Sequence, residues 1–548
     1  MDKKSFLNLF PYEQIRPHQL EVLNKIYDNY DKYDNFIIQA PTGTGKSALA
    51  YTICNSKQKG MILTGTKLLQ DQYIKEFPLL HCVKGKTSYK CLLDKYKDCS
   101  NGPCVHTGNE DANICKDCLY KQAIKQINAD VTVITNYSCL INNHSIKTRK
   151  NDVVIFDEAH TLEDALVEVQ AFSIDKQKLL ERYELDEFIE ELEDPLLASM
   201  VFTGLGFSDN EKTIEYNDKK YPRNIFILYI IEKLLAKKWN SLLTFDEYSD
   251  EELKIQEEIT KLRSKLKSYL DTYRNSNWIV NIVNKNSITI QPLNVAKLFN
   301  NLTKNCKKKI FMSATIISVQ DFIDTFNLDP KKTAYIEVKE TFNPSYAPII
   351  SYPVGRMGYK DIDKTIPSII KAIQDILEIH KNEKGLILTN NYRITESIIN
   401  QVKTNRFIHK YEKSYYYLTN EEMYQKHIKS KKPTVLISPS MNTGVDLPDD
   451  QSRFQIIVKL PYDNLGDKRI AYKAKTDRNW YMTRMIRSFI QSCGRSVRNE
   501  NDWAVTYVLD SSFLYTINEN KDKLTDTFRS RIFYQCDFNL QEFYQHIN

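Results

Sequence analysis

A glycine-rich segment, APTGTGKS at residues 40–47, joins an apolar run to a helical pattern. This strand–loop–helix order lets backbone N–H groups and the following helix dipole cradle phosphates. Ala40 takes the place of the usual first glycine and is similarly small. Lys46 would bridge the β- and γ-phosphates, and the Ser47 hydroxyl would ligate Mg²⁺. The sequence therefore predicts a nucleotide site formed by Thr42, Gly43, Thr44, Gly45, Lys46 and Ser47.

A second apolar run, VVIF, is followed directly by DEAH at residues 157–160. Ligands of open α/β sheets bind at the carboxyl ends of strands, so these side chains are expected beside the phosphates. Asp157 would hold Mg²⁺, directly or through water, and Glu158 would polarise the attacking water. His160 would couple the site to a second domain. Together with the glycine-rich loop, DEAH predicts nucleotide hydrolysis.

The segment FIQSCGRSVR at residues 489–498 has the features of a second wall for this site. Gln491, Arg495 and Arg498 are spaced to lie on one side of a helix. Phosphoryl transfer needs positive charge at the γ-phosphate, and arginines from a facing domain supply it. A solvated basic helix would explain the arginines but not the glutamine–glycine context.

Two further residues are expected near the nucleotide. The Gln19 amide in IRPHQ would read an adenine edge, although an exposed helix start explains it about as well. Asp446 follows a strand in SPSMNTGVDLP and would link the nucleotide state to the substrate surface. The MSATI segment at residues 312–316 is similar to a coupling element of the first domain.

Six of the eleven cysteines are crowded together: Cys82, Cys91, Cys99, Cys104, Cys115 and Cys118. In a reducing compartment this crowding indicates metal ligation rather than disulfides. By spacing alone, four thiolates fit tetrahedral zinc as well as an iron–sulfur cubane. The metal would act structurally first, since so small a module cannot bury enough core to fold unaided.

Short β-rich runs alternate with helical stretches, which predicts an α/β fold with parallel sheets. The runs form two sets, at 36–40, 60–66, 131–135, 153–157 and 309–315, and at 385–390, 434–440, 455–461 and 504–510. Two sets predict two domains, each a parallel sheet wrapped by helices.

Two segments interrupt the first set. Residues 81–128 hold the crowded cysteines and are expected to form a small loop-rich module. Residues 165–283 are expected to be mainly helical, with one long amphipathic helix at 251–273. The first domain would then comprise residues 1–80, 129–164 and 284–335, and the second residues 336–548.

The composition, with 42% hydrophobic and 27% charged residues, is typical of a soluble globular protein. The net charge of +6 permits a phosphate-backbone partner without requiring one. No run approaches the roughly 20 apolar residues that span a bilayer, and no signal peptide is recognisable. We therefore expect a protein of the cytoplasm or nucleoid with no membrane partner.

In their order along the chain, these motifs resemble those of the XPD/DinG family of superfamily 2 iron–sulfur helicases. The matching segments are IRPHQ, APTGTGKS, TGTKLLQDQ, the cysteine segment, ITNYSCL, DEAH, MSATI, GVDLP, IIVKLPY and QSCGRSVR. The resemblance implies two RecA-like domains, with an iron–sulfur module and an Arch domain inserted in the first. It also implies ATP-driven 5′→3′ movement on single-stranded DNA and unwinding of forked or tailed duplexes.

The resemblance implies metal ligands as well. The family's ligands begin after aromatic-x-Cys and end at Cys-x-aromatic, as at Cys91 and Cys118, although Leu119 replaces the usual proline. Cys99 is the alternative to Cys104. The expected ligands are Cys91, Cys104, Cys115 and Cys118. The implied cofactors are ATP, Mg²⁺ and a 4Fe–4S cluster, with zinc the weaker fit.

Two alternatives stay open: an RNA helicase, since no residue reports on 2′-OH recognition, and an ATP-switched nucleic-acid-binding protein that does not unwind. The short segment before IRPHQ leaves no room for an added nuclease domain, so we expect the motor alone. Replication or repair proteins are expected partners. The expected contacts to the nucleic-acid strand are Thr66, Gln70, Asn136, Tyr137, Asn390, Asn391 and Arg393.

Overall fold

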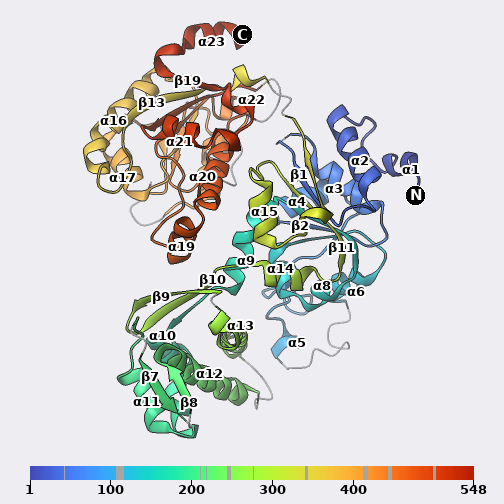
Figure 1. The fold of residues 1–548 in the computed structure, drawn as a ribbon, viewed down its shortest axis with the longest axis vertical. Coiled ribbons are helices and arrows are strands. Elements are labelled where there is room, and N and C mark those ends of the chain that lie inside the picture. The colour runs from blue at the N-terminus through green and yellow to red at the C-terminus, as the bar shows by residue number, and fades with distance from the viewer. Residues whose placement is uncertain are drawn as a thin grey trace.

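Two parallel sheets organise the chain, and they lie in separate parts of the molecule (Figure 1). The computed structural model describes residues 1–547 except 42, 107–116, 210–211, 217–218, 244–248, 276, 340–342, 412–416, 442–446 and 498–501. The α/β fold class with two parallel sheets that the sequence predicts is therefore confirmed.

The first sheet has the strand order β12-β1-β11-β5-β2-β4-β3, and all neighbouring strands are parallel. Alternate residues of its strands enter two separate core clusters, as Ile37 and Phe36 do, because helices cover both faces. The strands are β1 (Asn35–Gln39), β2 (Gly60–Thr64), β3 (His81–Cys82), β4 (Val133–Asn136), β5 (Asn151–Asp157), β11 (Cys306–Ser313) and β12 (Thr333–Glu337).

The second sheet has the order β15-β16-β14-β17-β18-β13-β19 and is also parallel throughout. Its long helices include α16 (Ile362–Ile379), α17 (Tyr392–Gln401), α19 (Lys468–Thr476) and α20 (Arg478–Cys493). The strands are β13 (Ile349–Gly355), β14 (Gly385–Leu388), β15 (Phe407–Ile408), β16 (Val435–Ser438), β17 (Phe454–Ile457), β18 (Val505–Asp510) and β19 (Ile532–Tyr534).

A unit with its own hydrophobic core interrupts the first sheet between β5 and β11. It begins at β6 (Phe172–Asp175) and ends at β10 (Ser287–Pro292), because β10 pairs with both β6 and β9 (Trp278–Asn284). The sequence-based range of 165–283 omits β10, and it includes α9 (Leu162–Gln170), whose apolar residues pack in the core of the first sheet domain.

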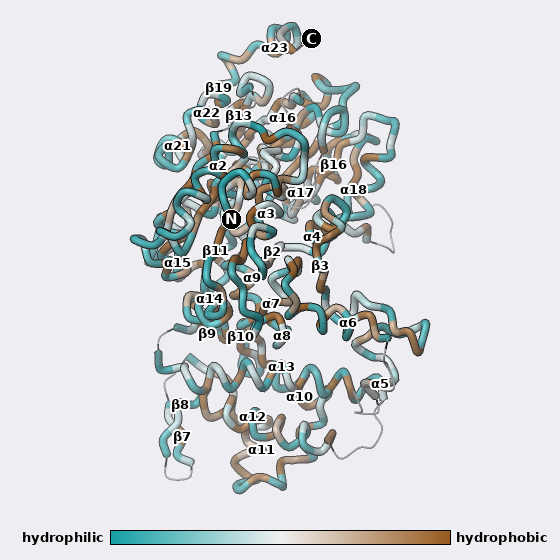
Figure 2. Tube along the Cα trace, turned by 90° about the vertical axis from the view of Figure 1, so that its right-hand side faces the viewer, coloured by the Kyte–Doolittle hydropathy of each residue, from teal (hydrophilic) through white to brown (hydrophobic). Residues whose placement is uncertain are grey.

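Two long helices dominate this unit, α12 (Arg223–Leu242) and α13 (Asp250–Thr272). Ser249 and Glu252 close a capping box at the start of α13, which explains where the helix expected at 251–273 begins. Figure 2 shows α13 between α12 and the first sheet domain.

The cysteine segment follows β3 at the edge of the first sheet and returns to it at β4. Its regular elements are η1 (Lys86–Ser88), α5 (Pro103–His106) and α6 (Leu119–Lys125). The segment reaches the inserted unit, where α5 lies beside α13 (Figure 2). Lys97 of the segment pairs with Asp250 at 3.1 Å. Among the described residues, no helix is both long and apolar enough to cross a membrane.

The packing of β14 against β17 predicts a specific sensitivity. A Cβ atom added at Gly385 would overlap the ring of Phe454 on the neighbouring strand. Gly385→Ala should therefore destabilise the protein by about 1–3 kcal/mol, because the buried ring has no free space to enter. Urea unfolding followed by circular dichroism measures the change.

Gly85→Ala is the matched control, since a Cβ there meets no heavy atom within 4 Å and the backbone φ of −67° suits alanine. Equal unfolding midpoints for the two variants would contradict the packing described for Gly385.

Candidate nucleotide site

The glycine-rich loop between β1 and α3 (Lys46–Asn55) has a backbone that requires glycine. Gly43 and Gly45 adopt φ values of 79° and 76°, the left-handed region that other residues rarely occupy. Lys46 begins α3, and its Nζ donates to the carbonyl oxygens of Ala40 and Pro41 at 3.2 and 3.4 Å. Thr42 lies outside the described residues.

Gln19 supports this loop from α2 (Pro17–Asn29). Its Nε2 donates to the Thr44 carbonyl oxygen at 2.9 Å, and its Oε1 accepts from the Arg16 backbone N–H at 3.0 Å. The side chain is buried, and a Cβ added at Gly45 would overlap it. Both ends of the amide therefore make a hydrogen bond within the protein, in an arrangement that shapes the phosphate loop, and the adenine-reading role stays a prediction.

The acidic pair lies at the carboxyl end of β5. Asp157 is buried and accepts a hydrogen bond from the Tyr73 hydroxyl at 2.8 Å. Burial and the neighbouring Glu158 charge raise the pKa of Asp157 from 3.8 to about 6. A buried carboxylate with this pKa lacks a full positive counter-charge, which a divalent cation supplies.

The pKa of Glu158 shifts in the opposite direction. Burial alone would raise its pKa, but a hydrogen bond from His160 and the positive charge of Lys46 outweigh burial and lower the pKa to about 2. Lys46 also opposes the rise in the pKa of Asp157. The loop and DEAH are therefore close enough to form one site, with Glu158 fully ionised at neutral pH.

Helix α20 of the second sheet domain lies against DEAH. The Gln491 Nε2 atom donates to His160 Nε2 at 2.8 Å and to Thr315 Oγ1 at 3.0 Å. His160 Nδ1 lies 2.9 Å from Ser313 Oγ and 3.2 Å from a Glu158 oxygen. Since an amide donor faces Nε2, the imidazole is neutral with its proton on Nδ1, and burial lowers the pKa of His160 accordingly.

Of the two arginines expected at the nucleotide site, the structure describes one. Arg495 follows α20, and its charge interacts with that of Glu158; burial outweighs this attraction and lowers the pKa of Arg495 to about 10. Arg495 thus stays positively charged at neutral pH. Arg498 and Asp446 lie outside the described residues.

Two residues at this site were not anticipated from the sequence. Tyr73, on α4 (Lys67–Glu76), holds Asp157, and no motif marks it. Arg487 donates through Nη1 to the His160 carbonyl oxygen at 3.4 Å. It precedes Gln491 by four residues, so helical spacing would have placed it on the same face of α20.

Three expected nucleic-acid contacts lie inside the first domain instead of on its surface. Gln70, Asn136 and Tyr137 are all buried. Gln70 Nε2 donates to the Val83 carbonyl oxygen at 3.0 Å, and the Tyr137 hydroxyl donates to the Asp157 carbonyl oxygen at 2.7 Å. These residues support the carboxyl ends of the β-strands behind the nucleotide site. The expectation that they contact the nucleic-acid strand directly was therefore wrong.

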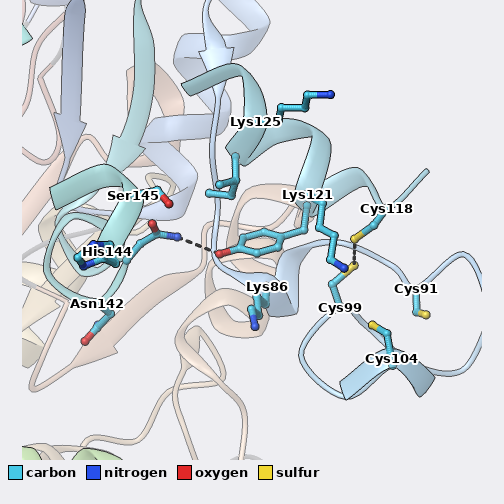
Figure 3. A pocket seen from close by; sticks show the side chains of 14 residues that line it. Lys86, Cys91, Cys99, Cys104, Cys118, Lys121, Lys125, Asn142, His144 and Ser145 are labelled. Atoms are coloured by element: carbon cyan, nitrogen blue, oxygen red, sulfur yellow. Dashed lines mark hydrogen bonds between the residues drawn. The ribbon is translucent and has the colours of Figure 1, made fainter. Parts of the chain in front are cut away.

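Four cysteines, Cys91, Cys99, Cys104 and Cys118, line one cavity of about 490 Å³ (Figure 3). Cys99 Sγ and Cys118 Sγ lie 3.7 Å apart, and burial raises the pKa of Cys99 to about 12. Cys115 lies outside the described residues. Within the described residues, no three His, Cys, Asp or Glu side chains converge as they would around a single metal ion.

The same cavity is basic on its other side. Its lining includes Lys86, Lys121 and Lys125, together with the loop between α7 (Tyr137–Asn142) and α8 (His144–Thr148). Tyr120 joins the two sides by accepting a hydrogen bond from Asn143 Nδ2 at 2.9 Å. Cys82 is not part of this lining; its Sγ accepts from Gln70 Nε2 at 3.3 Å.

The raised pKa of Asp157 predicts a pH-dependent stability change. Because the folded state favours protonated Asp157, this stabilisation is complete below pH 3.8 and is lost as pH rises through about 6. Asp157→Asn removes the ionisation and should stabilise the Mg²⁺-free protein at pH 8 by on the order of 2 kcal/mol. Urea unfolding at pH 8 and pH 4 tests this, since the gain should vanish at the lower pH.

Asp130→Asn provides the control, because that carboxylate is 62% exposed. If Asp157→Asn gained the same stability at pH 4 and at pH 8, ionisation of Asp157 would not destabilise the folded protein.

Comparison with known proteins places these two walls in a family context. A helicase C-terminal domain model matches residues 373–531, and a model of the type III restriction enzyme res subunit matches residues 13–185. The first range contains Gln491 and Arg495, and the second contains Lys46 and DEAH.

Curated relatives match most of the chain. A probable ATP-dependent helicase of Methanocaldococcus jannaschii is 24% identical, covering 92% of this chain and 92% of the relative. The 3′-5′ exonuclease DinG of Staphylococcus aureus is 23% identical, covering 92% of this chain and 69% of that protein.

Solved structures show the same fold. An XPD helicase structure superposes with a TM-score of 0.64 at 16% identity, covering 95% of this chain and 100% of the other. The structure of S. tokodaii Xpd4 gives a TM-score of 0.60 at 18% identity, with the same coverage. The motif order, the paired sheets and these matches together support an XPD/DinG-family helicase of superfamily 2.

Proposed function

We propose that this protein is an ATP-dependent DNA helicase that moves 5′→3′ on single-stranded DNA and unwinds forked or tailed duplexes. The observation that carries the proposal is the position of α20, which sets Gln491 against His160 while Arg495 interacts with Glu158. A nucleotide bound at Lys46 would then lie between two sheet domains, and its hydrolysis would alter their contact.

The chemistry follows from the charges of the two walls. Lys46 would hold the β- and γ-phosphates, and ionised Glu158 would accept a hydrogen bond from the attacking water and orient it. Arg495 would offset the charge that redistributes on the γ-phosphate. Gln491 would couple the nucleotide state of the first domain to the position of the second domain, since its side chain forms hydrogen bonds with both His160 and Thr315.

Mg²⁺ fits the first wall. Ser47 and Tyr73 line one cavity of about 440 Å³, and Tyr73 is hydrogen-bonded to Asp157. Ser47 and Asp157 would hold the ion, which supplies positive charge to the bound phosphates when present.

A 4Fe–4S cluster fits the cysteine cavity. Four thiols line it, the number of thiolates that holds a 4Fe–4S cluster. Three of the expected ligands, Cys91, Cys104 and Cys118, line the cavity, and Cys99 lines it with them. We infer that Cys99 is a ligand together with these three thiols. When bound, the cluster would stabilise the fold of this segment beside α13.

The proposed function is tested by ATPase assays with DNA and RNA and by unwinding of duplexes with 5′ or 3′ tails. Stimulation by single-stranded DNA together with unwinding from a 5′ tail supports the proposal. Unwinding only from a 3′ tail would contradict the polarity, and stimulation by RNA alone would indicate an RNA helicase. Stimulation without unwinding of any duplex would indicate an ATP-dependent switch.

Substitutions of Lys46 in the first domain and of Arg495 in the second should affect ATP binding and turnover differently. Lys46→Ala should abolish both ATP binding and turnover, because it removes the ammonium group placed to hold the β- and γ-phosphates. Arg495→Ala should bind ATP nearly as well as the wild type but turn over about a thousandfold more slowly. Equilibrium binding of a non-hydrolysable ATP analogue, measured beside steady-state turnover, separates these effects.

Arg478→Ala, at the exposed start of the same helix, is the matched control and should retain both properties. If Arg495→Ala kept wild-type turnover, the second domain would not contribute to hydrolysis in the way proposed.

The cysteine cavity predicts which thiols hold iron. Cys99→Ser should lose the visible absorption and the iron of anaerobically purified protein, because one of the four cavity thiols is gone. Cys82→Ser should keep both, since its sulfur lies outside the cavity lining. Full iron content in Cys99→Ser, with loss in Cys115→Ser, would instead restore the ligand set expected from the sequence.

A further inference from the structure

A buried carboxylate outside the nucleotide site connects the two sheet domains. Glu163 lies on α9, immediately after DEAH, and only 8% of it is exposed. Its Oε1 accepts from Arg469 Nη2 at 2.6 Å and from Lys473 Nζ at 3.1 Å. Its Oε2 accepts from Trp480 Nε1 at 3.1 Å. All three donors belong to α19 and α20 of the second sheet domain.

The cluster is held together by charge in a setting that excludes water. Burial alone would raise the pKa of Glu163, but the charges of Lys473, Arg469 and Arg484 lower it to about 2. Lys473 Nζ also lies 4.0 Å from the centre of the Trp480 ring. Breaking a buried pair by removing one partner leaves an uncompensated charge, so this contact strongly resists separation.

Neighbouring contacts fix the same half of α20 to the first domain. Arg484 Nη1 pairs with Asp164 of the first domain at 2.9 Å, while its Nε pairs with Asp463 of its own domain. Thr483 Oγ1 donates to Asp321, on α15 (Val319–Phe326), at 2.8 Å. Figure 1 shows α19 and α20 reaching from the second sheet domain toward α9.

The other half of α20 carries the residues that face the nucleotide site. Trp480, Arg484, Arg487 and Gln491 recur at helical spacing, and each contacts α9 or the DEAH segment before it. A rigid helix that is fixed at one end has its other end placed by that attachment. The location of Gln491 relative to His160 therefore depends on the contact made near Trp480.

We propose that Glu163 is a positioning residue, which anchors α19 and α20 to the helix after DEAH and thereby sets where Gln491 and Arg495 meet a bound nucleotide. Glu163 does not itself touch the nucleotide. This inference rests on the proposed function, because it assigns Glu163 a part in the same ATP-driven cycle.

The test separates positioning from binding. Glu163→Gln keeps the shape of the side chain but removes the charge that holds Arg469 and Lys473. Turnover of ATP should fall by about a hundredfold, as a displacement of roughly 1 Å does in active sites. The affinity for a non-hydrolysable ATP analogue should change little, because Lys46 and its loop remain intact.

Two companion variants refine the result. Glu163→Asp keeps the charge and should recover part of the lost turnover. Glu168→Gln, an exposed position on the same helix, should resemble the wild type. If Glu163→Gln does not fold, Lys473→Met decides in its place, since it removes a single donor at the rim of the cluster.

A readout that needs no catalysis completes the experiment. Small-angle X-ray scattering of the nucleotide-free protein should give a larger radius of gyration for Glu163→Gln than for the wild type, because the domains lose their anchor. Wild-type dimensions together with wild-type turnover would overturn the inference, as would equal losses of turnover and ATP affinity. A wild-type protein without nucleic-acid-stimulated ATPase would refute the proposed function, whereas the scattering comparison would still test the anchor.

Discussion

The arrangement depends on two adjacent carboxylates that are buried at the end of one strand beside a single ammonium group. Such charges are costly to remove from water unless partners surround them, and Asp157 and Glu158 share those partners unequally. Glu158 accepts a hydrogen bond from His160 and interacts with the charge of Arg495, so it stays ionised, whereas Asp157 has too little positive charge nearby to offset its burial. This imbalance supports the proposal that the site binds a divalent cation and a phosphate chain.

The second domain approaches this site along one helical face. From Trp480 to Gln491, α20 contacts the first domain at nearly every turn, and the contacts change in kind along its length. Near its start, α20 is attached through the Trp480 indole to buried Glu163 and through the Arg484–Asp164 ion pair, whereas Gln491 makes neutral hydrogen bonds. A hydrogen bond between neutral groups is weaker than one to a charged group, so Gln491 can change partners at lower cost than the start of the helix can.

Much of this was predictable from local sequence patterns. The β-rich runs correspond to strands in both sheets, and the phosphate loop and DEAH occupy the strand ends where they were expected. Local patterns do not reveal partners distant in sequence, which is why the engagement of Gln19 with Thr44 and the burial of Gln70 were missed. The contact of Glu163 with Arg469 spans 306 residues, and no motif marks it. The strands β3, β12, β13, β15 and β19 also went unrecognised, because no motif marks their runs.

The order of strands in the first sheet has a consequence for biosynthesis. Strand β11 lies between β1 and β5, so it separates the strand that carries the phosphate loop from the strand that ends in DEAH. It is encoded after the whole unit from Phe172 to Pro292. On the ribosome, β1 and β5 must therefore wait, with exposed edges, until that unit has emerged. Early folding of the inserted unit would shorten the effective distance between β5 and β11 and limit the period in which those edges are open to aggregation.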